Sequence, residues 1–140
     1  MPGEPKGSLV LIVEDNAANL LLVQAVLHRA GFRTEVARSA EEVPSILAIS
    51  RPDLILMDLQ LPGQDGLSLT AQIKRNAETA SIPIVALTAH AMKEDRDRAL
   101  AAGCDGYIAK PVNTRTLATE IASIMQARRA YILGEEPKDA

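Results

Sequence analysis

The strongest constraint on the fold is an alternation, repeated five times, between a short strand-like segment and a longer segment with helical spacing of apolar residues. The central strand-like segments are apolar at successive positions, so both of their faces must be covered, as in a parallel sheet between two layers of helices. The sequence therefore predicts a doubly wound α/β fold, a (βα)5 unit around a five-stranded parallel sheet. The predicted strands span residues 9–13, 33–37, 54–57, 84–87 and 107–109.

The predicted helices are bounded by residues that start or stop helices. Gly31 and Gly103 are placed to end the first and fourth helices, and Asn113 to cap the last one. Ser39, with Glu42 three residues later, predicts a capping box for the second helix. The first, third and fourth helices are expected at about residues 17–30, 66–75 and 92–102.

Pro44 conflicts with that capping box, because a proline fits only the first turn of a helix. Two outcomes are open: the second helix begins later than the box indicates, or its first turn is distorted.

Length and composition indicate a single folded domain and argue against direct nucleic-acid binding. It has 140 residues, of which 47% are hydrophobic, and a net charge of -3, which offers no large basic surface for nucleic acid. Aromatic residues make up only 2%, so base-stacking surfaces are poorly supplied. We expect a disordered segment at residues 1–8, the domain at 9–127, and a helix extension and tail at 128–140.

The single cysteine, Cys104, permits neither an internal disulfide nor a multi-cysteine metal site, and a small buried residue is the expectation for it. No apolar run approaches the roughly 18 residues of a membrane span, and no signal peptide is evident. We expect a soluble, cytoplasmic protein without membrane contact.

Polar side chains follow four of the predicted strands where these end. Glu14 and Asp15 follow the first strand, Asp58 the third, Thr88 the fourth and Lys110 the fifth. In doubly wound sheets the functional crevice lies beyond the carboxyl ends of the strands, so we expect these groups to meet. Two carboxylates about 5 Å apart repel by roughly 3 kcal/mol at an effective dielectric of about 20, and one lysine cannot cancel three such pairs.

A divalent cation would relieve this repulsion. Carboxylate oxygens without histidine or cysteine suit Mg²⁺, which often shares its shell with a phosphoryl group. With the charge neutralised, Asp58 can act as an oxygen nucleophile toward phosphorus and become an aspartyl phosphate. Lys110 would hold one phosphoryl oxygen and Thr88 would donate a hydrogen bond to another.

Four motifs give the chain a specific resemblance. The segments Val13-Glu14-Asp15-Asn16, Met57-Asp58-Leu59-Gln60-Leu61-Pro62-Gly63-Gln64-Asp65-Gly66, Leu87-Thr88-Ala89 and Tyr107-Ile108-Ala109-Lys110-Pro111 stand at normal intervals for the receiver domains of two-component response regulators. The chain resembles this family from about residue 9 to residue 127. The resemblance implies the CheY-like, flavodoxin-like strand order 2-1-3-4-5.

The resemblance also implies a function. Asp58 would accept a phosphoryl group from a phosphohistidine on a histidine kinase or histidine phosphotransfer protein, and the domain would catalyse its own phosphorylation and dephosphorylation without being an enzyme toward other substrates. Mg²⁺ would be held by Asp15, Asp58, the Gln60 carbonyl and, through water, Glu14.

Further residue roles come from the same resemblance. Ala89 and Lys110 would contact the phosphoryl group, and the Lys110–Pro111 bond would be cis. Thr88 and Tyr107 would form the switch that changes the surface of the fourth helix, fifth strand and fifth helix. Coupling of this kind is typically worth about 1 to 3 kcal/mol.

Among receivers, the chain looks closest to stand-alone regulators of the DivK type and to receivers attached to hybrid histidine kinases. We expect a single-domain response regulator, with a receiver detached from a hybrid kinase as the alternative. About a dozen residues follow the last helix, too few for a DNA-binding or enzymatic output domain. Output is therefore expected through contact with a downstream protein or through phosphorelay, without direct nucleic-acid binding.

Alternative interpretations are weaker. A phosphatase acting through an aspartyl phosphate generally needs a second acid two residues after the nucleophile, where this chain has Gln60. A nucleotide-binding module would need a glycine-rich phosphate loop after the first strand, and none follows it. His90, two residues past Thr88, either tunes the phosphate lifetime or is idle. The apolar residues 131–133 suggest a homodimer or partner contact through the C-terminal extension, or packing on the same domain.

Overall fold

The computed structural model contains one five-stranded parallel sheet in the order β2-β1-β3-β4-β5, which confirms the predicted fold class and strand order. It describes residues 7–61, 65–89 and 92–132, with side chains as far as Arg128. The strands are β1 (Leu9–Val13), β2 (Arg33–Ala37), β3 (Leu54–Asp58), β4 (Ile84–Thr88) and β5 (Gly106–Ala109).

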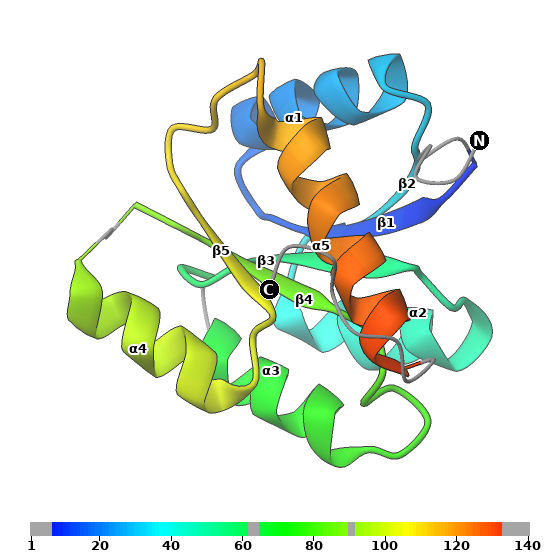
Figure 1. Cartoon of the computed structure of the whole chain (residues 1–140), viewed down its shortest axis with the longest axis vertical. Coiled ribbons are helices and arrows are strands. Elements are labelled where there is room, and N and C mark those ends of the chain that lie inside the picture. The colour runs from blue at the N-terminus through cyan, green and yellow to red at the C-terminus, as the bar shows by residue number, and fades with distance from the viewer. Residues whose placement is uncertain (1–6, 62–64, 90–91, 133–140) are drawn as a thin grey trace.

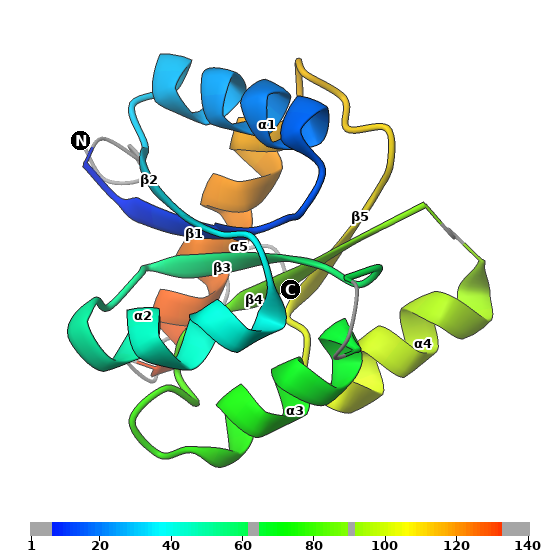
Figure 2. The same ribbon diagram turned by 180° about the vertical axis from the view of Figure 1, so that it is seen from behind.

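Helices cover both faces of the sheet. Helices α1 and α5 lie on one face, and α2, α3 and α4 lie on the other (Figures 1 and 2). A short 3-10 helix, η1 (Ala40–Glu42), precedes α2. The helices are α1 (Ala17–Arg29), α2 (Val43–Ile49), α3 (Gly66–Arg75), α4 (Lys93–Ala102) and α5 (Leu117–Ile132).

The core is aliphatic and has two halves, because successive strand residues point to opposite faces. On β3, Leu54 and Leu56 pack toward α1 and α5, whereas Ile55 and Met57 pack toward α2, α3 and α4. Every residue of β3 and β4 is buried, which explains the unbroken apolar runs at residues 54–57 and 84–87. Cys104 is buried in the second half, as expected, and burial raises the pKa of its thiol to about 11.

The predicted helix ends are confirmed where a single residue determines them. The Asn16 side chain caps α1 by accepting a hydrogen bond from the Asn19 N–H at 3.0 Å. Gly31 and Gly103 have φ angles of 99° and 109°, a conformation that residues with a Cβ rarely adopt. Asn113 differs from the prediction: its side chain accepts from the Arg115 N–H in a turn at residues 114–116, and α5 begins only after that turn, at Leu117.

The predicted capping box at the second helix is wrong in one respect. The Ser39 hydroxyl makes no bond to a helix N–H and instead donates to the Glu42 carboxylate at 3.2 Å. Both outcomes that Pro44 left open are found together: a 3-10 turn comes first, and the α-helix begins at Val43, which places Pro44 in its first turn. There the missing proline N–H costs nothing.

Small shifts affect several other boundaries, and β3 and β4 each extend one residue further than predicted, to Asp58 and Thr88. The fourth helix begins at Lys93, with Met92 as its N-cap, and the first ends at Arg29. The fifth strand begins at Gly106, where α5 approaches closely: a Cβ there would lie 2.5 Å from the Ile124 side chain.

Parts of the expected domain layout lie outside the described residues. Within the expected segment 1–8, the structure describes Gly7, which donates from its N–H to the Gly31 carbonyl, and Ser8, whose carbonyl accepts from Arg33. The side chains of residues 131–133 and all of His90 are outside the described part, so the expectations for them stay predictions. Among the described residues, none of the helices has the length and apolar character needed to cross a membrane.

Candidate functional site at the carboxyl edge of the sheet

The strand register brings the predicted site residues to one edge of the sheet. Val13 pairs with Ala37 and Met57, so Glu14 and Asp58 follow neighbouring strands at the same level. Asp58 pairs with Leu87, and Thr88 pairs with Ala109, which places Lys110 directly beyond β5. The site is thus a direct result of parallel pairing in the order that the sequence predicted.

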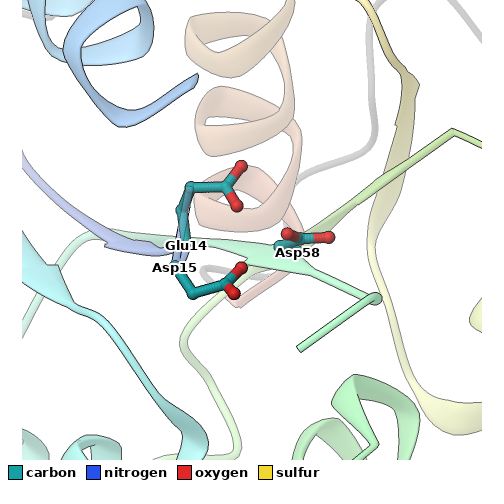
Figure 3. A group of neighbouring side chains, drawn as sticks. All are labelled: Glu14, Asp15 and Asp58. Atoms are coloured by element: carbon teal, nitrogen blue, oxygen red, sulfur yellow. The ribbon is translucent and has the colours of Figure 1, made fainter. Parts of the chain in front are cut away.

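Three carboxylates form an acidic cluster at this edge: Glu14, Asp15 and Asp58. Figure 3 shows Glu14 and Asp15 at the end of β1 and Asp58 at the end of β3. Each offers one oxygen within 4.8 Å of the others, and Glu14 and Asp58 are buried, whereas Asp15 is exposed. Oxygen donors of this kind suit a hard cation, which the cluster could hold between the two strands.

Asp58 is 2% exposed and has two fixed partners. Its Oδ2 lies 3.1 Å from the Lys110 ammonium, and its Oδ1 accepts a hydrogen bond from the Gln60 N–H at 2.9 Å. Gly66 lies directly beside this turn, since a Cβ at that position would come within 2.9 Å of the Asp58 carbonyl oxygen. The Asp58 side chain is therefore held at the strand tip by the Lys110 ammonium and by the Gln60 backbone N–H.

Glu14 is 1% exposed, and its Oε1 has no hydrogen-bond partner among the described residues. The Lys110 ammonium is 3.7 Å from that oxygen, beyond hydrogen-bond distance. Burial, followed by the nearby Asp58 carboxylate, raises the pKa of Glu14 to about 7, against the opposing effects of Lys110 and of the Asn16 N–H. An incompletely partnered buried carboxylate fits the cation site that the donor set indicates.

The remaining predicted residues surround this cluster. Thr88 is buried at the end of β4, and its carbonyl accepts from the Lys110 N–H at 2.7 Å; Ala89, the next residue, is exposed. The Lys110–Pro111 bond is cis, the geometry that the resemblance implies. Tyr107 is partly buried on β5, where burial and then the charge of Asp95 on α4 raise the pKa of its phenol.

One residue near the cluster was absent from the sequence prediction. Arg38 follows β2 directly, and its Nη2 donates to the Asp15 carbonyl at 3.3 Å. The signal was its position at the tip of the second strand, which lies beside β1 in the predicted order. An exposed arginine in a polar loop carries no other mark of this contact.

The comparisons with known proteins agree with this geometry. The family model described as the response regulator receiver domain matches residues 10–122. The chain belongs to this family. A receiver domain is a signalling module, and the cluster at its strand tips could bind a metal ion.

Particular receiver proteins are similar over most of the chain. The polar-differentiation response regulator DivK of Brucella anthropi is 40% identical over 116 residues, which cover 83% of this chain and 94% of DivK. The receiver domain of the sensor histidine kinase PA1611 from Pseudomonas aeruginosa, solved with a magnesium ion in its active-site cleft, is 34% identical, with a TM-score of 0.78 and coverage of 85% and 98%. The chemotaxis response regulator CheY4 of Vibrio cholerae is 25% identical, with a TM-score of 0.80 and coverage of 85% and 99%.

Proposed function

We propose that this receiver accepts a phosphoryl group on Asp58 from a phosphohistidine of a histidine kinase or histidine phosphotransfer protein. The observation that carries the proposal is the placement of Asp58: a buried carboxylate at a strand tip, 3.1 Å from the Lys110 ammonium and within reach of two further carboxylates. A structural ion pair needs only one acid and one base, and it does not account for three clustered carboxylates.

The donor set supports Mg²⁺ as the cation. Asp15, Asp58 and the Gln60 carbonyl would hold it directly, and Glu14 through water. The bound ion would neutralise the cluster and draw charge from the phosphoryl oxygens, which lets an anionic carboxylate approach an anionic donor. The unpartnered Glu14 Oε1 and the magnesium-containing PA1611 receiver both support this assignment.

The transfer is a displacement at phosphorus. An Asp58 carboxylate oxygen forms the new bond to phosphorus as the phosphorus–nitrogen bond of the phosphohistidine breaks, and its electron pair remains on the imidazole nitrogen, which takes up a proton. Lys110 binds one phosphoryl oxygen, Thr88 donates to another and Ala89 contacts the group from the β4 side. Attack by water on phosphorus later releases phosphate and restores the carboxylate.

Phosphorylation changes the balance between two conformations of the domain. The phosphoryl group adds about two negative charges and three acceptor oxygens, so it gives Thr88 and Lys110 contacts that only the phosphorylated protein offers. Thr88 moves toward the phosphoryl group, Tyr107 turns inward, and the surface of α4, β5 and α5 changes. The partial burial of Tyr107 beside α4 supports this pairing.

The output is a changed affinity for a downstream protein, or onward transfer of the phosphoryl group in a relay. DivK is a polar-differentiation response regulator and PA1611 is a sensor histidine kinase, so similar receivers occur in both settings. A homodimer through the C-terminal extension and a cytoplasmic location complete the proposal.

The test is phosphorylation by a small donor. We expect the protein, incubated with acetyl phosphate and Mg²⁺, to gain one phosphoryl group by intact mass, and this gain to be lost with a chelator or in Asp58→Asn. Asp97→Asn, which changes an exposed aspartate of α4, is the matched control and should be labelled like the wild type. Unlabelled wild type, or labelled Asp58→Asn, would refute the assignment.

A further inference from the structure

Asp15 is the one exposed member of the acidic cluster. Burial fixes Glu14 and Asp58, and Lys110 lies beside both of them. Asp15 lacks that enclosure, so the placement of its carboxylate depends on the conformation of residues 14–16, the loop between β1 and α1.

The last residue of β2 and the residue after it bind this loop at two successive residues, Glu14 and Asp15. The Ala37 carbonyl accepts from the Glu14 N–H at 3.0 Å, and the Arg38 Nη2 donates to the Asp15 carbonyl at 3.3 Å. The first contact continues the ladder between the strands. The second contact is made by the Arg38 side chain, and it binds Asp15, the exposed member of the acidic cluster.

The backbone of Arg38 is in turn bound by the Glu42 carboxylate at the end of η1. Its N–H donates to the Glu42 Oε2 at 3.1 Å, and the Ser39 hydroxyl donates to the same oxygen at 3.2 Å. A chain of hydrogen bonds therefore runs from η1 through Arg38 to Asp15. Ser39 and Glu42, which do not form the predicted capping box, thus bind each other and the Arg38 N–H in the loop that carries Arg38.

We propose that Arg38 is a positioning residue for the metal site, one that fixes the β1–α1 loop so that the Asp15 carboxylate is in place before Mg²⁺ arrives. The inference rests on the proposed function. Groups that orient a metal ligand without touching the metal commonly contribute about tenfold to affinity. Arg38 acts here on the backbone of the ligand residue.

Charge and positioning make opposite predictions for this residue. A cation near the site repels Mg²⁺, so if charge alone mattered, Arg38→Ala would bind Mg²⁺ more tightly. Because Arg38 is exposed, solvent and salt screen that repulsion, whereas the loss of loop order is not screened. We therefore expect a net loss of affinity in the variant.

The measurement is a Mg²⁺ titration of the full chain, followed through the backbone amide signals of Asp15, Asn16 and Asp58 by NMR. We expect Arg38→Ala to bind Mg²⁺ about five- to tenfold more weakly, with the loss unchanged at high salt. Arg38→Lys, which keeps a donor of similar reach, should recover most of the affinity.

Arg33→Ala is the matched control. Arg33 is exposed at the opposite end of β2 and also donates to a backbone carbonyl, that of Gly7, at 2.7 Å. Its loss should leave Mg²⁺ affinity unchanged. Glu42→Gln is a second probe of the same chain of bonds, and we expect a smaller loss in the same direction.

Phosphorylation by acetyl phosphate gives an independent readout. In Arg38→Ala the Mg²⁺ concentration for half-maximal rate should rise by the same factor, while the rate at saturating Mg²⁺ stays within about twofold of the wild type. If the wild type binds Mg²⁺ and is phosphorylated but Arg38→Ala binds equally or more tightly, the positioning role is overturned and the proposed function stands. A wild type that fails both assays overturns the proposed function as well.

Discussion

Glu14 and Asp15 are adjacent in the chain but lie in different environments. Glu14 is almost fully buried beside Asp58, and Asp15 is exposed. Successive residues at the end of a strand point in different directions, so the Glu14 carboxylate is enclosed by protein while the Asp15 carboxylate faces solvent.

Burial gives Glu14 a measurable effect on stability. The pKa of Glu14 is about 7 in the folded protein and has an ordinary value of 4.5. The folded state therefore binds the Glu14 proton more tightly than the unfolded state does. The contribution of Glu14 to the free energy of unfolding is fully present below pH 4.5 and is lost as pH rises through about 7. The whole shift corresponds to roughly 3 kcal/mol.

We expect Glu14→Gln to remove this decrease in metal-free protein. The quantity to compare is the free energy of unfolding of the variant minus that of the wild type, from urea unfolding with a chelator present. This difference should be larger at pH 8 than at pH 5 by up to roughly 3 kcal/mol. Glu41→Gln, at an exposed position of η1, is the control and should show no such trend. A difference between wild type and Glu14→Gln that is constant with pH would contradict the expectation.

At the scale of elements, a second group of charges joins α3, β5 and α5 at the other end of the sheet. The Lys74 ammonium lies 2.9 Å from the Asp105 carboxylate and donates to the carbonyls of Ala80 and Ile82. Arg128 of α5 donates to the carbonyls of Ala80 and Ser81. These bonds hold the start of β5 and the second half of α5 to the turn between α3 and β4.

Lys74→Met should weaken this junction. The methionine keeps the apolar stem but leaves two carbonyls and part of a carboxylate without their donor, so we expect a loss of roughly 1–3 kcal/mol in the free energy of unfolding, measured in urea. Arg75→Met, at the exposed neighbouring position of α3, should change it by less than about 0.5 kcal/mol. Equal effects of the two variants would show that the junction adds no stability.

The contacts of Arg128 determine which truncation can test the C-terminal extension. A truncation after residue 127 would remove the Arg128 contacts together with residues 131–133, so a loss of stability would not test the homodimer hypothesis. A chain that ends at residue 130 keeps Arg128 and removes the apolar group, so its mass in solution tests that hypothesis cleanly.

For the whole molecule, the proposed cation site can form only when the sheet is assembled, because Asp15 follows β1 and Asp58 ends β3, 43 positions (58 minus 15) further along the chain. A ligand that binds only the folded state stabilises it, by about 1.4 kcal/mol at ten times its dissociation constant. Mg²⁺ at that concentration should therefore raise the melting temperature by about 4 °C.

Differential scanning calorimetry with Mg²⁺ and with chelator measures this shift. Asp15→Asn and Asp58→Asn should each lose most of it, because each removes a charged ligand. An equal rise with KCl at matched ionic strength would assign the effect to general screening of the acidic cluster and contradict specific binding.

The sequence by itself determined the elements, their order in the sheet and the main members of the site. Apolar periodicity is a local property, and the register of a parallel sheet brings every strand tip to one edge, so Asp58, Thr88 and Lys110 could be predicted to meet without coordinates. The order of the strands was implied by the resemblance to receiver domains that the four motifs carry.

Only the tertiary structure decided what depends on packing between distant segments. The contact of Arg38 with Asp15, the role of Glu42 behind it and the burial that raises the pKa of Glu14 all require the orientation of side chains from different elements. No local pattern encodes that orientation, because a polar residue in a loop looks the same in sequence whether it faces solvent or a neighbouring backbone carbonyl. The sheet places the loops side by side, and the geometry of that placement makes the contacts.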